Sequence, residues 1–130
     1  MNQNLHQFIL SARNSKNRAG SVVAWVNEPK FDGLYVRYGR RHLRFEDGDL
    51  RTYKDVLDIA NVTVELAHQR QGILTNLIHR IREMYPDIGI YVENARPDTA
   101  EPLLRRGFKI VRYDDVLSQH SWFLPPIQDH

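Results

Sequence analysis

The stretch from Val64 to Thr75, VELAHQRQGILT, constrains the fold more than any other part of the chain. A β-prone run passes into a turn that contains Gly72, and a helix with one apolar face follows at once. A helix that begins directly after a strand leaves several backbone N–H groups without partners, and such groups bind phosphate. The pattern Gln69-x-x-Gly72 therefore predicts an α/β fold with a site for a ligand that carries a pyrophosphate.

The composition is that of a folded, single-domain protein without cysteine chemistry. The chain has 130 residues, of which 42% are hydrophobic, and it has no Cys. Disulfides, a Cys nucleophile and thiolate metal sites are therefore excluded. No apolar run approaches the roughly 20 residues that a membrane span needs, and the first residues lack the order of a signal peptide. We expect one cytoplasmic domain over residues 1–130, with no membrane partner.

The first half of the chain predicts one helix followed by strands. Apolar residues at helical spacing place a short helix at residues 4–13, and a β-prone run follows from Ser21 to Val26. The next strand is expected from Leu34 to Phe45, and Asp47-Gly48 is a strong hairpin signal. Two further strands are expected over 50–53 and about 56–66. The side chains expected to share one face are Leu34, Val36 and Tyr38 in the first long strand, and Ala60, Val62, Val64 and Leu66 in the last.

The second half alternates helices and strands. A helix is expected from Gly72 to about Tyr85, because an apolar stripe recurs at helical spacing and Pro86 stops it; the stripe is Leu74, Leu77, Ile78, Ile81 and Met84. Ile88, Ile90 and Val92 alternate in the following strand. Pro97 opens a second helix, and Gly107 closes it. A strand over 108–113 follows, and Trp122 to Leu124 reads as a last, edge-type strand. The pattern indicates one α/β domain with a mixed sheet.

Residues from about Val56 to Tyr113 resemble the GNAT superfamily of acyl-CoA-dependent N-acyltransferases. That family carries a pyrophosphate loop of pattern (Gln/Arg)-x-x-Gly-x-(Gly/Ala) between a central strand and a helix. Gln69 and Gly72 match its first two fixed positions, and Leu74 departs at the third. The strand Ile88–Asn94, the expected helix 97–106 and the pair Gly107-Phe108 match the family's next block. The first 55 residues match only in the order of their elements.

The resemblance implies a fold, a co-substrate and a reaction. The fold is an α/β GNAT fold, with a mixed, mostly antiparallel central sheet that has splayed central strands and is flanked by helices. The co-substrate is acetyl-CoA, and no metal is needed. An amine attacks the thioester directly in a ternary complex, so no protein nucleophile is required. The implied cofactor-binding residues are Val64, Leu66, Gln69, Arg70, Gln71, Gly72, Ile73, Leu74, Thr75 and Asn94.

In this fold the main chain near Val64 and Leu66 pairs with the pantetheine arm, and the Leu66 N–H polarises the thioester carbonyl. A base must also take a proton from the attacking ammonium. The candidate catalytic residues are Glu65, Asp58 and Tyr91, with Glu93 and His68 as further bases and Tyr113 as a further acid. Each has an ordinary structural interpretation as a surface carboxylate or a packing aromatic.

Two departures keep an alternative open. The family often protonates the leaving thiolate with a Tyr four residues before the Gly of Gly-Phe, and this chain has Leu103 there. Tyr91 or Tyr113 is then the acid, or water takes that role. Together with Leu74, this departure supports an inactive GNAT-fold domain that binds acyl-CoA or a protein.

The partners other than acetyl-CoA are less constrained by the sequence. Arg37, Arg40, Arg41 and Arg44 interleave with aromatics in a way that suits nucleic acid, but a net charge of only +2 argues against such a binder. We favour a solvated strand face for these arginines. The amine acceptor, a protein or a small molecule, is not specified. The C-terminal strand with Trp122 and Phe123 offers a route to a homodimer.

Overall fold

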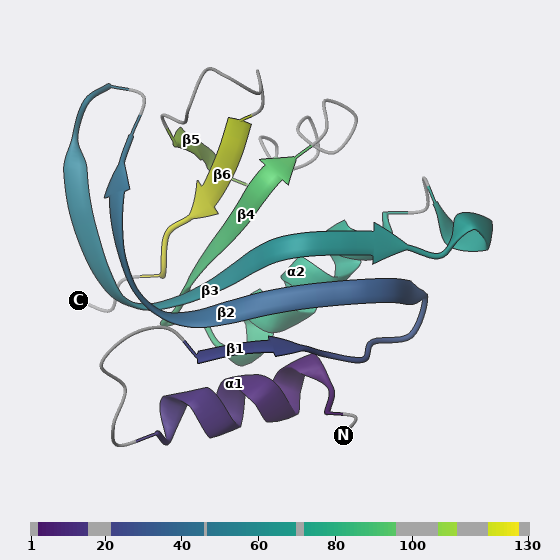
Figure 1. The fold of residues 1–130 in the computed structure, drawn as a ribbon. Coiled ribbons are helices and arrows are strands. Elements are labelled where there is room, and N and C mark those ends of the chain that lie inside the picture. Colours follow the sequence, from purple (N-terminus) through teal and green to yellow (C-terminus); the bar gives the residue numbers. More distant parts are fainter. Residues whose placement is uncertain are drawn as a thin grey trace.

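The computed structural model describes residues 3–15, 22–45, 47–69, 72–95, 107–111 and 120–127. The element order is α1 (Leu5–Arg13), β1 (Val22–Trp25), β2 (Phe31–Arg44), β3 (Leu50–Val64), the 3-10 turn η1 (Leu66–His68), α2 (Ile73–Met84), β4 (Gly89–Ala95), β5 (Lys109–Val111) and β6 (His120–Leu124). These strands form one sheet in the order β1-β2-β3-β4-β6-β5 (Figure 1). β3 and β4 run parallel, whereas the other neighbouring strands are antiparallel. The predicted mixed, mostly antiparallel sheet flanked by helices is confirmed.

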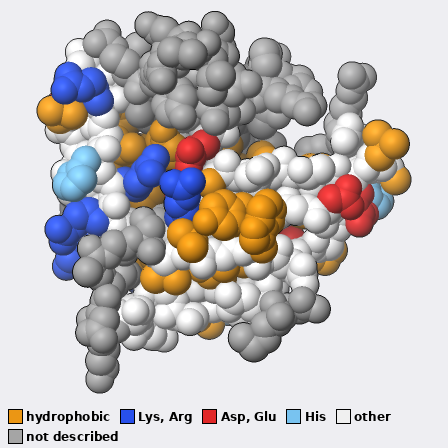
Figure 2. All heavy atoms as spheres, viewed as in Figure 1, with side chains coloured by type: hydrophobic (Ala, Val, Ile, Leu, Met, Phe, Trp, Pro, Cys, Tyr) orange, Lys and Arg blue, Asp and Glu red, His pale blue; other side chains and the backbone are white. Residues whose placement is uncertain are grey.

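One face of the sheet, here called the helix face, carries the main hydrophobic core. Side chains of α1, α2 and the central strands form one cluster there, and α2 lies behind the sheet in Figure 1. The predicted face of β2 is correct, because Leu34, Val36 and Tyr38 are all fully buried in this cluster. The opposite face holds a smaller cluster of Leu43, Phe45, Val56, Tyr91 and Phe123. Figure 2 views this opposite face, where hydrophobic and basic side chains lie next to each other.

The two described helices begin where the sequence predicts. At α1, the Asn4 side chain accepts from the Gln7 backbone N–H, and the Gln7 side chain accepts from that of Asn4, which is a capping box. The expected apolar stripe of α2 is correct up to Ile81, but Met84 is 48% exposed and Tyr85 is buried instead. Tyr85 is about one helical turn after Ile81, so it lies on the same side of the helix and its ring packs in the main core.

β3 differs from the prediction of two separate strands. It is one strand of 15 residues, because a bulge opposite Gly39–Arg41 carries the ladder past residues 54 and 55 without ending it. A second bulge, opposite Tyr35–Val36, moves the core-facing positions from Leu57 and Ile59 to Val62. The expected continuation to Leu66 is wrong: the strand ends at Val64, and Leu66 lies in η1 with 84% of its surface exposed.

The C-terminal strand β6 is not the edge strand that its sequence indicates. It lies between β4 and β5 and pairs with both. Trp122 and Phe123 are consequently buried within the chain at 4% and 0% exposure. These two side chains are therefore not available for contact with a second copy of the chain. Dimerisation itself stays a prediction. The expected helix 97–106 and Tyr113 lie outside the described residues.

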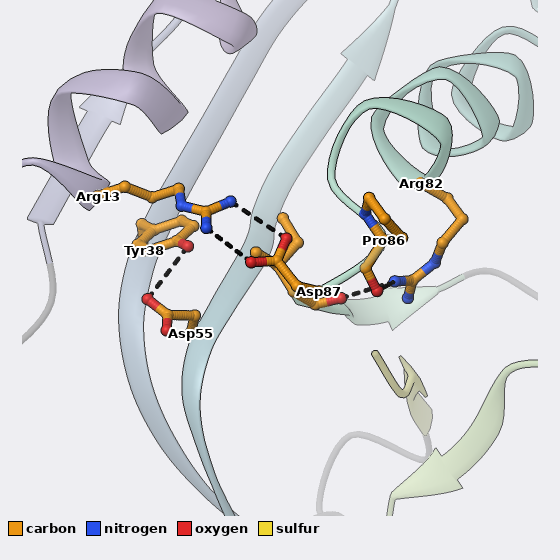
Figure 3. Close-up of polar contacts among 7 residues, drawn as sticks. Arg13, Tyr38, Asp55, Arg82, Pro86 and Asp87 are labelled. Atoms are coloured by element: carbon orange, nitrogen blue, oxygen red, sulfur yellow. Dashed lines mark hydrogen bonds and ion pairs between the residues drawn. The ribbon is translucent and has the colours of Figure 1, made fainter. Parts of the chain in front are cut away.

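Polar side chains fasten the helices to the end of the sheet. Arg13 of α1 forms a two-pronged ion pair with Asp87 in the turn before β4, at 2.6 and 3.2 Å, and Tyr38 donates to Asp55 at 3.2 Å (Figure 3). Arg82 of α2 donates to four backbone carbonyls, those of Pro86, Ile88, Leu124 and Pro125, at 2.8–3.2 Å. Burial lowers the pKa of Arg82. This one side chain therefore joins α2 to the ends of both β4 and β6.

None of the helices in the described part of the chain is both long and apolar enough to span a membrane.

We predict that Arg82→Met destabilises the fold by about 3 kcal/mol, because several inward-facing carbonyls lose their charged donor while the aliphatic volume is kept. The free energy of unfolding from urea titration measures this. Arg40→Met is the control, since it makes the same change at an exposed position on β2. Equal stability of the two variants would mean that the four carbonyl contacts contribute nothing.

Candidate functional site

The sheet opens between its two parallel strands. β3 and β4 are paired from Val56↔Gly89 to Ile59↔Val92, and their pairing ends there, although β3 continues to Val64 and β4 to Ala95. In Figure 1 the two strands diverge beyond this point. We call the region between residues 60–64 and 93–95 the splay. The predicted splayed central strands are therefore confirmed, and the splay leaves strand edges available for an extended ligand.

The N-terminus of α2 lies just beyond the end of β3. Gly72 occupies its N-cap with φ 69°, a left-handed conformation that favours glycine. No described side chain caps the helix, and its first turn holds no acidic residue. Because the first intrahelical bond runs from Asn76 to Gly72, the earlier N–H groups of Ile73, Leu74 and Thr75 have no partner within the helix. The sequence assigns the pyrophosphate to these N–H groups, and this assignment stays a prediction.

The remaining residues of the predicted loop are placed only in part. Gln69 donates its side-chain amide to the Val64 carbonyl at 3.2 Å, which ties the loop back to the end of β3. Arg70 and Gln71 lie outside the described residues. Thr75 is only 9% exposed, so its side chain is largely buried.

One edge of β3 faces the splay. The Glu65 N–H donates to the Lys30 carbonyl on the β2 side at 2.9 Å. Since successive residues of a strand point their N–H groups to opposite sides, the Val64 N–H faces the splay. Leu66, which was expected to share this edge, lies beyond the strand in η1. Asn94 belongs to β4, where its side chain is not among those described.

A buried acidic residue lies at the point where the splay begins. Asp58 is 1% exposed, and its neighbours across the sheet are Arg37 on β2 and Tyr91 on β4. Arg41 reaches it with an Nη1–Oδ2 distance of 3.3 Å and stacks its guanidinium 4.4 Å from the centre of the Tyr91 ring. The structure thus brings together two of the predicted catalytic residues, Asp58 and Tyr91, and adds Arg41, which the sequence had indicated as part of a solvated face.

Asp58 has a second carboxyl group, that of Glu93, as its neighbour. Burial and the neighbouring Glu93 raise the pKa of Asp58 to about 8, and the opposing charge of Arg41 does not offset them. Neither Asp58 oxygen nor Glu93 Oε2 has a hydrogen-bond donor among the described residues. The proton that Asp58 keeps at neutral pH is available for a hydrogen bond to Glu93. The pair is therefore able to accept or release one proton near neutral pH.

The other two sequence candidates lie elsewhere. Glu65 precedes η1 and His68 is its last residue; their side chains approach to 3.6 Å and are 45% and 33% exposed. They follow the end of β3, several residues along the strand from Asp58. Burial raises the pKa of Tyr91, so its phenol stays protonated at neutral pH. No group of three or more His, Asp or Glu side chains suited to a metal ion occurs among the described residues.

No family model and no curated protein matches the chain, whereas several solved structures are similar to it, two of which are named here. One is the Bacillus subtilis N-acetyltransferase YlbP in complex with coenzyme A, with 15% identity, a TM-score of 0.46, and coverage of 93% of this chain and 80% of that chain. The other is AtaT complexed with acetyl-methionyl-tRNAfMet, with 14% identity, a TM-score of 0.45, and coverage of 92% and 81%. Likenesses this distant assign no activity, ligand or acceptor to this chain.

We predict that Asp58 makes the fold less stable as the pH rises. The unfolded chain releases this proton near pH 4, whereas the folded chain keeps it until about pH 8. Between these values the folded state binds more protons, so the free energy of unfolding falls as the pH rises. Urea titrations across this range measure the slope, and Asp58→Asn is expected to lose that part of it. An identical slope in both proteins would contradict the raised pKa.

Proposed function

We propose that this protein is an N-acyltransferase of the GNAT superfamily that transfers an acetyl group from acetyl-CoA to an amine. The observation that carries the proposal is the splay. The parallel strands β3 and β4 separate beside a buried carboxyl pair, and the uncapped N-terminus of α2 follows the end of β3. An extended thioester fits this arrangement, with its phosphates at the helix and its acyl group near the carboxyls.

The backbone supplies most of the groups that would hold the co-substrate. The N–H groups at the start of α2, which have no partner within the helix, suit a pyrophosphate, and the positive end of the helix dipole adds to the attraction. The edge of β3 at Val64 suits the amide groups of the pantetheine arm, which would pair with it as an added strand. The Gln69 contact to Val64 holds the loop between these two places.

The carboxyl pair provides the acid–base chemistry. The acceptor amine attacks the thioester carbonyl carbon, the C–S bond breaks, and CoA leaves as its thiolate. The ammonium proton passes to the Asp58–Glu93 pair, with the half-buried Glu93 nearer the substrate and the buried Asp58 behind it. The thiolate then takes a proton from Tyr91 or from water, since Leu103 occupies the family's usual acid position.

For the co-substrate site, we predict that acetyl-CoA binding in calorimetric titration is lost in Gly72→Trp. The positive φ of Gly72 disfavours any side chain, and an indole there would cover the first N–H groups of α2. Gly48→Ala is the control, because Gly48 also has a positive φ but lies in the β2–β3 hairpin. Unchanged binding in Gly72→Trp would mean that the loop is only a structural turn.

For the reaction, we predict that kcat/KM rises with pH through an inflection near 8 and falls at least about 100-fold in Asp58→Asn. Glu93→Gln is expected to move the inflection to lower pH, because Glu93 raises the pKa of Asp58. Glu65→Gln is the matched control and keeps both rate and profile. Acetyl-CoA binding without turnover in the wild-type chain would favour the alternative, an inactive acyl-CoA-binding domain.

A further inference from the structure

The opposite face of the sheet carries an exposed aromatic pair that the proposed chemistry does not use. Trp25 of β1 is 61% exposed and lies beside Tyr35 of β2, with ring centres 5.0 Å apart. A Cβ added at Gly33 would stand 3.2 Å from the indole ring, so this glycine lets the indole lie close against the sheet. Figure 2 shows a hydrophobic area on this face over β1 and β2, with basic side chains next to it.

Cross-strand pairing connects this surface to the splay. Trp25 pairs with Tyr35, and Tyr35 pairs with Asn61, which is an exposed residue of β3 within the splay. The neighbouring row on the same face runs from Arg37 through Asp58 to Tyr91. The aromatic pair and the carboxyl pair are therefore neighbours on one surface, and the row of Trp25, Tyr35 and Asn61 leads from solvent to the place where the acyl group would lie.

We propose that this row is the acceptor site and that it takes a small arylalkylamine bearing a carboxylate, the chemistry of a free aromatic amino acid. This inference rests on the proposed acetyl transfer. Adjacent strands are about 4.8 Å apart, so Trp25 and Asn61 are separated by roughly 10 Å. A ring stacked on Trp25 and Tyr35 then brings an amine two carbons away to the splay beside Asn61. A molecule of this size spans the row without needing a macromolecule.

The charge of the surface selects among amines. The Arg37 guanidinium lies 5.9 Å from the centre of the Tyr35 ring, and Arg41 lies farther along the same face. Asp58, the nearest acid, holds its proton at neutral pH. The two arginines outweigh the single negative charge of the Asp58–Glu93 pair, so this surface favours an acceptor with a carboxylate at Arg37 and disfavours polyamines.

The test compares acceptors that differ in one group each. CoA release from acetyl-CoA is measured with L-phenylalanine, L-leucine, 2-phenylethylamine and spermidine. We expect L-phenylalanine to have the highest kcat/KM, because leucine lacks the ring, 2-phenylethylamine lacks the carboxylate, and spermidine is a polycation. Equal values for phenylalanine and leucine, or a preference for spermidine, would overturn the proposal.

Substitutions at Trp25 and Arg37 show which residue is responsible for each acceptor preference. Trp25→Ala is expected to lower kcat/KM for L-phenylalanine about 10-fold, mainly through KM, and to leave L-leucine nearly unchanged. Arg37→Gln is expected to remove the advantage of L-phenylalanine over 2-phenylethylamine. Met84→Ala is the control, since Met84 is an exposed apolar residue on α2. An equal loss for all acceptors in Trp25→Ala would indicate a structural role and contradict the acceptor site.

A second measurement separates this inference from the proposed function. The chain has two Trp residues, and Trp122 is only 4% exposed, so a fluorescence change that is absent in Trp25→Phe belongs to Trp25. Titration with L-phenylalanine without CoA is expected to change that signal, and L-leucine is not. Such a change in a chain that does not bind acetyl-CoA would reject the transferase and keep the aromatic site. Acetyl transfer without a fluorescence change at Trp25 would reject the aromatic acceptor site and keep the transferase.

Discussion

The short parallel pairing of β3 with β4 is the constraint on which the rest of the structure depends. Parallel strands need a crossover, and α2 provides it, so the helix must begin just beyond the end of β3. The pairing lasts from Val56↔Gly89 to Ile59↔Val92, after which β4 continues beside β6. This one arrangement gives the splay, the free edge of β3 and the uncapped helix N-terminus.

Burial at the start of the splay raises the pKa of the Asp58 carboxyl group. Asp58 is 1% exposed and lies opposite Tyr91 across the sheet, so little water can solvate its charge. Arg41 gives partial compensation, and its stacking on Tyr91 limits how far it can move toward Asp58. Because burial disfavours the ionised form of Asp58, its pKa is raised, and a carboxyl with a pKa near neutral suits acid–base catalysis.

Stability and chemistry are supplied by different parts of the molecule. Arg82 and the Arg13–Asp87 pair fasten the helices at one end of the sheet, where β4 begins and β6 ends. Gly72 and the splay lie toward the other end of β3 and β4. These charged contacts hold the helices to one end of the sheet. At the opposite end, backbone groups stay available to a ligand. The exposed aromatic pair beside the splay adds side-chain selectivity to this backbone site.

The sequence alone determined the local elements: helical spacing located α1 and α2, Gly72 marked the start of α2, and alternation identified the buried face of β2. It also named Asp58, Tyr91 and Glu93. Only the tertiary structure decided that β6 lies between β4 and β5. It also decided that bulges join two predicted strands into β3. The ion pair of Arg41 with the buried Asp58 likewise depends on the folded chain. The reason is physical. Caps and periodicity act between residues a few positions apart, whereas strand order, register and the desolvation of a carboxyl depend on residues that meet only in the folded chain.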